Sequence, residues 1–193
     1  MRKSLILGLG NELLRDDRVG LVAARRVAKL AGAKADLALA CVATLDLLPL
    51  IAGYEKVVVV DAFRSPDVPP GSALRATPES LPEGFGTRSY HTCPMRDLLA
   101  LGRELGLSMP HEVSIHGLSV DDAETFGRTF TPAVKRAWRD WADGIAQAEF
   151  PSQTASAPPS RCESAAGRDA RGGPGSMSSR GFRGLAAACT STA

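Results

Sequence analysis

The sequence predicts a three-layer α/β fold, in which a twisted, mainly parallel sheet of about five strands is flanked by helices. Short apolar runs alternate with amphipathic stretches over residues 1–150, which is typical of consecutive β-α-β units. Residues 56–61 read KVVVVD, and four consecutive valines favour a strand that is buried on both faces of a parallel sheet. The chain has 193 residues, of which 44% are hydrophobic, so it can form one domain with its own core.

The first half of the domain contains three predicted strands and two predicted helices. Residues 4–9 (SLILGL) form a short apolar run ending in glycines, which indicates a buried strand. Residues 19–30 place apolar side chains at helical spacing and basic ones on the other face, which indicates an amphipathic helix. Residues 36–42 (DLALACV) are expected to form the second strand, residues 45–52 a short helix, and residues 56–61 the third strand.

The second half continues the alternation. Residues 73–76 are expected to form a short strand at an edge of the sheet, and residues 95–105 (MRDLLALGREL) a helix. Residues 112–118 (EVSIHGL) alternate in polarity, which predicts a further strand. Residues 131–149 are expected to form a long helix, because they begin with Thr-Pro, a cap residue followed by proline at the first helical position.

The end of the chain differs in composition. Gly, Pro, Ser and Ala make up 27 of the 43 residues in the segment 151–193. Such a segment buries too little apolar surface to offset the entropy lost on ordering. We therefore expect an α/β domain over residues 1–150 and a disordered low-complexity tail over residues 151–193.

Charge, cysteine content and hydropathy narrow the class of protein. The formal net charge of +2 is too small to indicate a nucleic-acid partner. The four cysteines have no zinc-site spacing and no disulfide framework, which fits a reducing compartment. No apolar run approaches the roughly 20 residues that span a bilayer, and we read the N-terminus as a strand rather than a signal peptide. We expect a cytoplasmic monomer that binds neither nucleic acid nor membrane.

A glycine-containing turn follows the first predicted strand, in the stretch LGLGNELLRDDRVG (residues 7–20). A dinucleotide-binding turn requires a third glycine where this chain has Leu13, and the Walker lysine is missing. Asp16 and Asp17 would also repel a pyrophosphate. We therefore expect no nucleotide at this turn.

These acids have candidate partners elsewhere in the chain. Asp16 and Asp17 leave the first strand, and Asp61 is the last residue of the predicted valine strand, so all three belong to the carboxyl edge of the sheet, where ligands bind in open α/β folds. If the loop carrying His91 folds over this edge, two carboxylates and an imidazole meet in a set that suits nickel, zinc or iron. We expect His116, on a predicted strand, to be structural.

Other roles for these residues stay open at this level. Asp16 or Asp17 could cap the helix that follows, since acids are favoured at helix N-termini. Asp61 could cap a turn, and His91 could be an ordinary loop histidine. Cys93, two residues after His91, could form a Cys/His nucleophile, although no orienting Asp or Asn is evident.

Three stretches, of which the glycine-containing turn over residues 7–20 is the first, together resemble the hydrogenase maturation proteases. These are the endopeptidases that trim the C-terminus of the [NiFe]-hydrogenase large subunit. VVVVDAF (57–63) resembles the strand of that family that ends in Asp-Ala, and SYHTCPMRDLLALGREL (89–105) resembles its Ser-x-His segment. The resemblance covers residues 1–148. The first stretch carries the most specific motif, which here consists of Gly8, Gly10, Asn11, Leu13, Asp16, Asp17 and Gly20.

The resemblance implies a phosphorylase/hydrolase-like fold and an aspartyl-type endopeptidase that processes the large-subunit precursor after nickel insertion. Asp17, Asp61 and His91 match the family residues that contact nickel carried by the substrate, so they are the implied metal ligands and catalytic residues. Two mechanisms stay open. In one, the metal activates a water molecule or polarises the scissile carbonyl. In the other, a carboxylate, that of Asp17 or that of Asp61, acts as general base. The loop residues implied to support the site are Gly8, Gly10, Asn11 and Asp16.

The chain departs from the family pattern in three places. Arg18 replaces a glycine beside Asp17; it could pair with Asp17 or Asp16, or point to solvent. Thr92 and Cys93 replace the glycine that often follows the histidine, and residues 41–49 (CVATLDLLP) lack the family's polar loop. Arg18 and the altered loop motivate an alternative function, a non-proteolytic metal-binding or chaperone-type module on the same fold.

Overall fold

The computed structural model describes residues 2–41, 45–81 and 94–151. The predicted disordered tail therefore lies outside the described residues except for Pro151. The strands are β1 (Arg2–Leu9), β2 (Asp36–Ala40), β3 (Tyr54–Phe63), β4 (Ala73–Ala76) and β5 (Glu112–Ser119). The helices are α1 (Val19–Ala31), α2 (Leu48–Ile51), α3 (Met95–Glu104) and α4 (Pro132–Glu149), with short 3-10 turns at Gly32–Lys34 and Leu45–Leu47.

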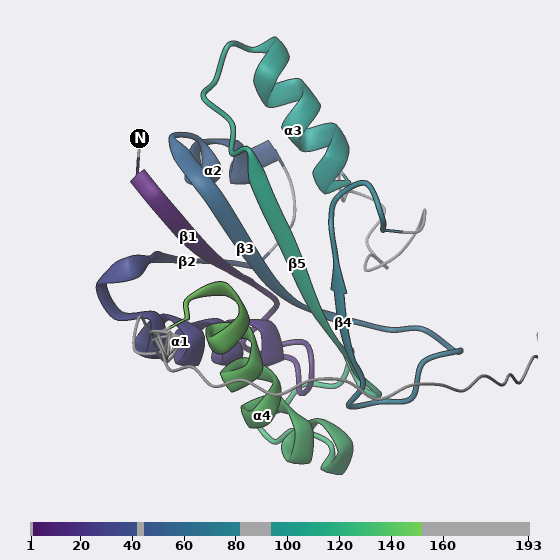
Figure 1. Ribbon diagram of the computed structural model, residues 1–193. Coiled ribbons are helices and arrows are strands. Elements are labelled where there is room, and N and C mark those ends of the chain that lie inside the picture. Colours follow the sequence, from purple (N-terminus) through teal and green to yellow (C-terminus); the bar gives the residue numbers. More distant parts are fainter. Residues whose placement is uncertain (1, 42–44, 82–93, 152–193) are drawn as a thin grey trace, which may run out of the picture. The chain divides into compact units, whose positions relative to one another are not determined.

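The strands form one sheet in the order β2-β1-β3-β5-β4 (Figure 1). The first four of these pair in parallel, and β4 pairs antiparallel with β5 at the edge. The predicted mainly parallel five-stranded sheet, with residues 73–76 at an edge, is confirmed. The valine run lies at the centre, between β1 and β5, which explains its continuous apolar character.

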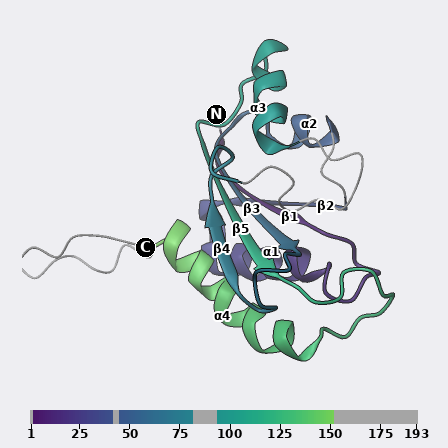
Figure 2. The same cartoon turned by 90° about the vertical axis from the view of Figure 1, so that its right-hand side faces the viewer.

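Helices cover both faces of the sheet (Figure 2). On one face α1 and α4 pack on Ile6, Val58 and Val60, which point to that side by strand alternation. On the other face α2 and α3 pack on the alternate residues, including Leu7 and Val59. The result is the predicted three-layer arrangement. Among the described helices, none is both long and apolar enough to cross a membrane.

Several predicted boundaries shift by one to three residues, and three of these shifts have a structural reason. β3 continues two residues past Asp61, because Ala62 and Phe63 still pair with β5. β2 ends at Ala40, which is the last residue with a partner on β1 and whose carbonyl accepts the Gly10 N–H. The predicted helix over residues 45–52 is split, since α2 begins at Leu48 with a proline in its first turn, where the missing N–H is tolerated.

Small residues let α1 approach the carboxyl ends of the strands. A Cβ on Gly20, in the first turn of α1, would lie 2.1 Å from the Leu9 carbonyl oxygen and 2.7 Å from that of Val60. A Cβ on Gly8 would lie 2.6 Å from the Ala24 Cβ. This close approach holds the loop between β1 and α1 directly against β3.

Substituting Gly20→Ala should therefore destabilise the fold. The methyl group has only backbone to displace, and we expect a loss of about 2–3 kcal/mol in the free energy of unfolding. Gly144→Ala is the matched control, because Gly144 is an exposed helical residue with open space at its Cβ, and it should gain about 0.5–1 kcal/mol. Urea denaturation measures both, and equal effects of the two substitutions would contradict this packing.

Candidate functional site

The turn after β1 folds back on its own acids. Gly10 has φ 138°, a backbone conformation that favours glycine, and a Cβ there would lie 2.2 Å from the Asp17 carbonyl oxygen. The Asn11 N–H donates to Asp17 Oδ2 at 2.7 Å, and Asn11 Oδ1 accepts the Leu13 N–H at 2.9 Å. The turn's donors are thus used to position a carboxylate of the chain itself, which explains why it carries acids where other turns bind phosphate.

Asp16 is fully buried and joins distant parts of the chain. Its carboxylate accepts the Thr131 N–H at 2.8 Å, the Thr131 hydroxyl at 2.7 Å and the Asp122 N–H at 3.2 Å. The alternative that Asp16 or Asp17 caps α1 is wrong, since the N-cap residue of α1 is Arg18 and no side chain caps it. Asp16 instead anchors the start of α4, where Thr131 is the predicted N-cap residue.

The contribution of Asp122 and Thr131 to this site could not be predicted from the sequence. They lie more than 100 residues from Asp16, and no local pattern marks them as its partners. The Thr-Pro start of α4 predicts a cap residue at Thr131, but its hydroxyl donates to Asp16 and makes no cap within its own helix.

Asp17 and Asp61 are neighbouring carboxylates at the carboxyl edge of the sheet. Gly20 lies close to both residues. A Cβ added to Gly20 would be 3.0 Å from the Asp61 Cα, and Gly20 is three residues after Asp17. The pKa of Asp61 is raised to about 7, mainly by burial; the hydrogen bond from the Ala62 N–H opposes this rise and the charge of Asp17 adds to it. Burial also raises the pKa of Asp17, partly offset by the Asn11 N–H.

Arg18 does not pair with either acid in the structure. Its guanidinium donates to the Arg128 carbonyl and lies over the Phe130 ring, 5.3 Å from the ring centroid. The sequence left two orientations open for Arg18, an ion pair with Asp17 or Asp16 and a side chain in solvent. The structure shows a third orientation, toward Arg128 and Phe130. Within the described segments, the two acids Asp17 and Asp61 have no cationic partner.

The third predicted ligand, His91, lies outside the described residues, as does Cys93. In the parts of the chain that the structure describes, no three His, Cys, Asp or Glu side chains group closely enough to hold a metal ion. Two of the three predicted ligands are thus brought together, and the approach of His91 stays a prediction.

His116 has the structural role expected of it. By register it lies beside Val60 on the sheet face covered by α1 and α4, whereas Asp61 lies on the other face, beside Gly117. His116 Nε2 is 2.9 Å from Glu149 Oε1, and Glu149 also forms ion pairs with Lys56 and Arg75. The His116 hydrogen bond holds the pKa of the buried Glu149 carboxyl down at about 2, helped by Lys56.

Removal of charge should destabilise the fold much more at Asp16 than at Asp17. Asp16→Asn loses acceptor capacity for three donors, two of them buried, and should lower the free energy of unfolding by about 3 kcal/mol. Asp17→Asn should lower it by less than about 1 kcal/mol, because burial already disfavours the Asp17 charge. Urea denaturation at pH 7 measures both, and equal losses would show that Asp16 is not the structural anchor.

The raised pKa of Asp61 predicts a pH dependence of stability. Between its ordinary value of 3.8 and about 7, the folded protein holds a proton that the unfolded chain has released. Stability should therefore fall as pH rises through this window, by up to about 4 kcal/mol. Urea unfolding from pH 4 to 8 should show a flatter profile for Asp61→Asn. An unchanged profile in this variant, matching that of the exposed Asp67→Asn control, would contradict the assignment.

Known proteins resemble this chain in sequence. A family model described as hydrogenase maturation protease matches residues 40–148, which is more than half of the chain and includes Asp61. The hydrogenase expression/formation protein HupD of Rhodobacter capsulatus is 28% identical over 134 residues, covering 67% of this chain; the chain spans 63% of the length of HupD.

Solved structures share the fold. The [NiFe] hydrogenase maturation protease HybD from Thermococcus kodakarensis is 26% identical, with a TM-score of 0.58 over 77% of this chain and 99% of that one. The hydrogenase maturating endopeptidase HybD from E. coli, at 24% identity, has a TM-score of 0.59 over 76% and 93%, a likeness of fold. The sequence resemblance and the three-layer fold are thereby confirmed, and the chain belongs to the hydrogenase maturation protease family.

Proposed function

We propose that this protein is an endopeptidase that removes the C-terminal extension of a [NiFe]-hydrogenase large-subunit precursor after nickel insertion. Nickel carried by the precursor would be the recognition element, and the protein would store no metal of its own. Family membership supports the reaction class. The cytoplasmic location, the monomeric state and the absence of a bound nucleotide stay predictions of the sequence.

One observation carries this proposal: Asp17 and Asp61 are adjacent, partly buried and without a cationic partner in the described segments. Each disfavours the ionised form of the other, so a cation placed between them would relieve both the repulsion and the desolvation. Carboxylate oxygens are suitable ligands for divalent transition metals, and the imidazole of His91 would complete the set. Three protein ligands leave coordination positions for groups of the precursor.

The same pair suggests how the peptide bond is cleaved. We propose Asp61 as general base, because its carboxylate lies beside Asp17 in the proposed site and a positioned carboxylate can accept a proton from the attacking water. Water attacks the scissile carbonyl and gives a proton to Asp61, which passes it to the leaving amine as the C–N bond breaks. Asp17, fixed by the Asn11 N–H, would position the nickel. The other route, in which nickel polarises the carbonyl, uses the same residues.

The alternative of a non-proteolytic module is weakened by one observation. It was motivated by Arg18, whose guanidinium is directed to Arg128 and Phe130 and leaves Asp17 free for a cation. Its other motive, the altered loop over residues 41–49, lies partly outside the described residues. Binding of the precursor without cleavage would favour this module.

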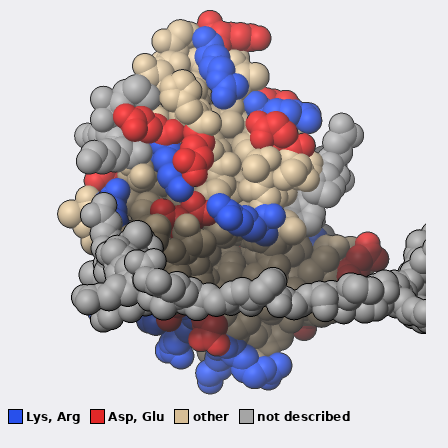
Figure 3. All heavy atoms as spheres, viewed as in Figure 1, with Lys and Arg blue, Asp and Glu red and all other residues tan. Residues whose placement is uncertain are grey.

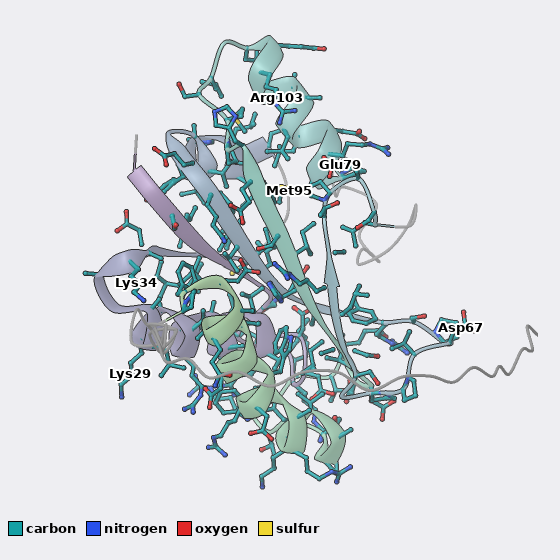
Figure 4. The ribbon with its side chains drawn as sticks, in the orientation of Figure 1. Lys29, Lys34, Asp67, Glu79, Met95 and Arg103 are labelled. Carbon is teal, nitrogen blue, oxygen red and sulfur yellow. The ribbon has the colours of Figure 1, made fainter. Side chains whose placement is uncertain are left out.

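The test is incubation with nickel-loaded and nickel-free precursor, followed by gel or mass analysis of the C-terminus. We expect cleavage of the loaded form only. Asp17→Asn, Asp61→Asn and His91→Gln should each lower the cleavage rate by at least about 100-fold, because each removes a ligand or the base. Asp67→Asn is the matched control on the exposed loop after β3 (Figure 4) and should act like the wild type.

Two results would contradict the proposal. Cleavage of nickel-free precursor at the wild-type rate would exclude nickel as the recognition element. Full cleavage by Asp17→Asn and His91→Gln, with folding verified by circular dichroism, would exclude the site assignment.

A further inference from the structure

A pocket lined by arginines opens beside the Asp17 loop. Its volume is about 220 Å³, and we call it the Arg128 pocket. Its walls come from the loop after β1, from one face of α1 and from the loop between β5 and α4. The lining residues are Glu12, Arg18, Leu21, Val22, Arg25 and Arg128.

Positive charge is in excess in this pocket. Three guanidinium groups face one carboxylate, that of Glu12, which pairs with Arg25. The hydrogen bond from Arg25 lowers the pKa of Glu12, and the charges of Arg18 and Arg128 lower it further, so the four groups act on one another. Arg18 uses one nitrogen on a backbone carbonyl. Among the described residues, the exposed Arg128 side chain has no ion-pair partner.

Two exposed apolar side chains lie on the loops that form the pocket. Leu13 and Phe126 are 58% and 77% exposed. Their loops are joined by backbone hydrogen bonds, from the Gly127 N–H to the Leu13 carbonyl and from the Arg15 N–H to the Thr125 carbonyl, each 2.9 Å long. Large apolar side chains held exposed on paired backbone, next to a charged pocket, indicate a contact surface for another molecule.

The Arg128 pocket is close to the proposed nickel site along the chain. Glu12 directly follows Asn11, whose N–H binds Asp17, and Arg18 directly follows Asp17. At about 3.3 Å per extended residue, a peptide held at Asp17 reaches the pocket within a few residues. On the face seen in Figure 3, Lys and Arg side chains lie around α4, with Asp and Glu side chains among them.

We propose that the Arg128 pocket binds a carboxylate of the precursor within a few residues of the scissile bond, while Leu13 and Phe126 contact an adjacent apolar side chain. This inference rests on the proposed function and names a specificity determinant for it. Arginine matches the planar, two-oxygen geometry of a carboxylate. Glu12 inside the pocket opposes a doubly charged phosphate, and the volume is too small for a nucleotide.

The test compares Arg128→Glu with Arg103→Glu, which makes the same charge change on α3, on the other face of the sheet (Figure 4). Steady-state cleavage of nickel-loaded precursor gives kcat and KM separately. Arg128→Glu should raise KM by at least about tenfold, with a smaller effect on kcat, because it places an unpaired like charge against the substrate carboxylate. The KM of Arg128→Lys should lie between those of the wild type and Arg128→Glu, and the KM of Arg103→Glu should equal that of the wild type.

Changes in the precursor identify the carboxylate. Acidic residues near the cleavage site are replaced one at a time by Lys, and a separate precursor carries an amidated C-terminus. One Lys replacement should restore a low KM with Arg128→Glu if a side chain enters the pocket. If amidation alone raises the wild-type KM, the chain-terminal carboxylate is the ligand. Either result supports the pocket.

Failure of this inference is distinguishable from failure of the proposed function. If the wild type cleaves and Arg128→Glu has the KM of Arg103→Glu, the pocket is overturned and the protease assignment stands. If the wild type does not cleave, the protease assignment fails, and calorimetric binding of the loaded precursor still tests the pocket. Equal affinities of Arg128→Glu and Arg103→Glu in that measurement would overturn it.

Discussion

The buried carboxylate of Asp16 is the interaction on which the candidate site depends. A charged group without solvent is tolerated only when donors surround it, and here Thr131 and Asp122 supply three. These donors belong to the segment between β5 and α4, so one side chain fixes the start of α1 and the start of α4 together. The position of the next residue, Asp17, follows from this anchor.

Two adjacent acids thus have different surroundings for physical reasons. Both carboxylate oxygens of Asp16 accept hydrogen bonds inside the protein, and its fully buried side chain is not available to a ligand. Asp17 receives one backbone N–H and, within the described segments, no cation, and it faces a second carboxylate on β3. The fold leaves negative charge uncompensated at the edge of the sheet where ligands of α/β proteins bind, and this favours a cation delivered by a substrate.

Another buried acid, Glu149, has cationic partners, whereas Asp61 has none among the residues that the structure describes. Glu149 is as buried as a core residue, but it pairs with His116, Lys56 and Arg75, and His116 and Lys56 lower its pKa to about 2. Asp61 has a pKa of about 7 on the opposite face of the same sheet. The chain therefore supplies cations to Glu149 and three neutral donors to Asp16, whereas Asp61 receives, among the described residues, only the Ala62 N–H; this difference supports Asp61 as a candidate functional acid.

The sequence by itself determined the order of strands and helices along the chain, the edge position of residues 73–76, and the turn that carries Asp16 and Asp17. Hydropathy period and turn residues are local properties, so these predictions were possible. Only the tertiary structure decided which acid, Asp16 or Asp17, is the anchor, because the choice depends on Thr131, more than 100 residues away. The extension of β3 beyond Asp61 and the direction of Arg18 were likewise set by long-range partners, strand β5 and the Arg128 loop, which no local pattern encodes.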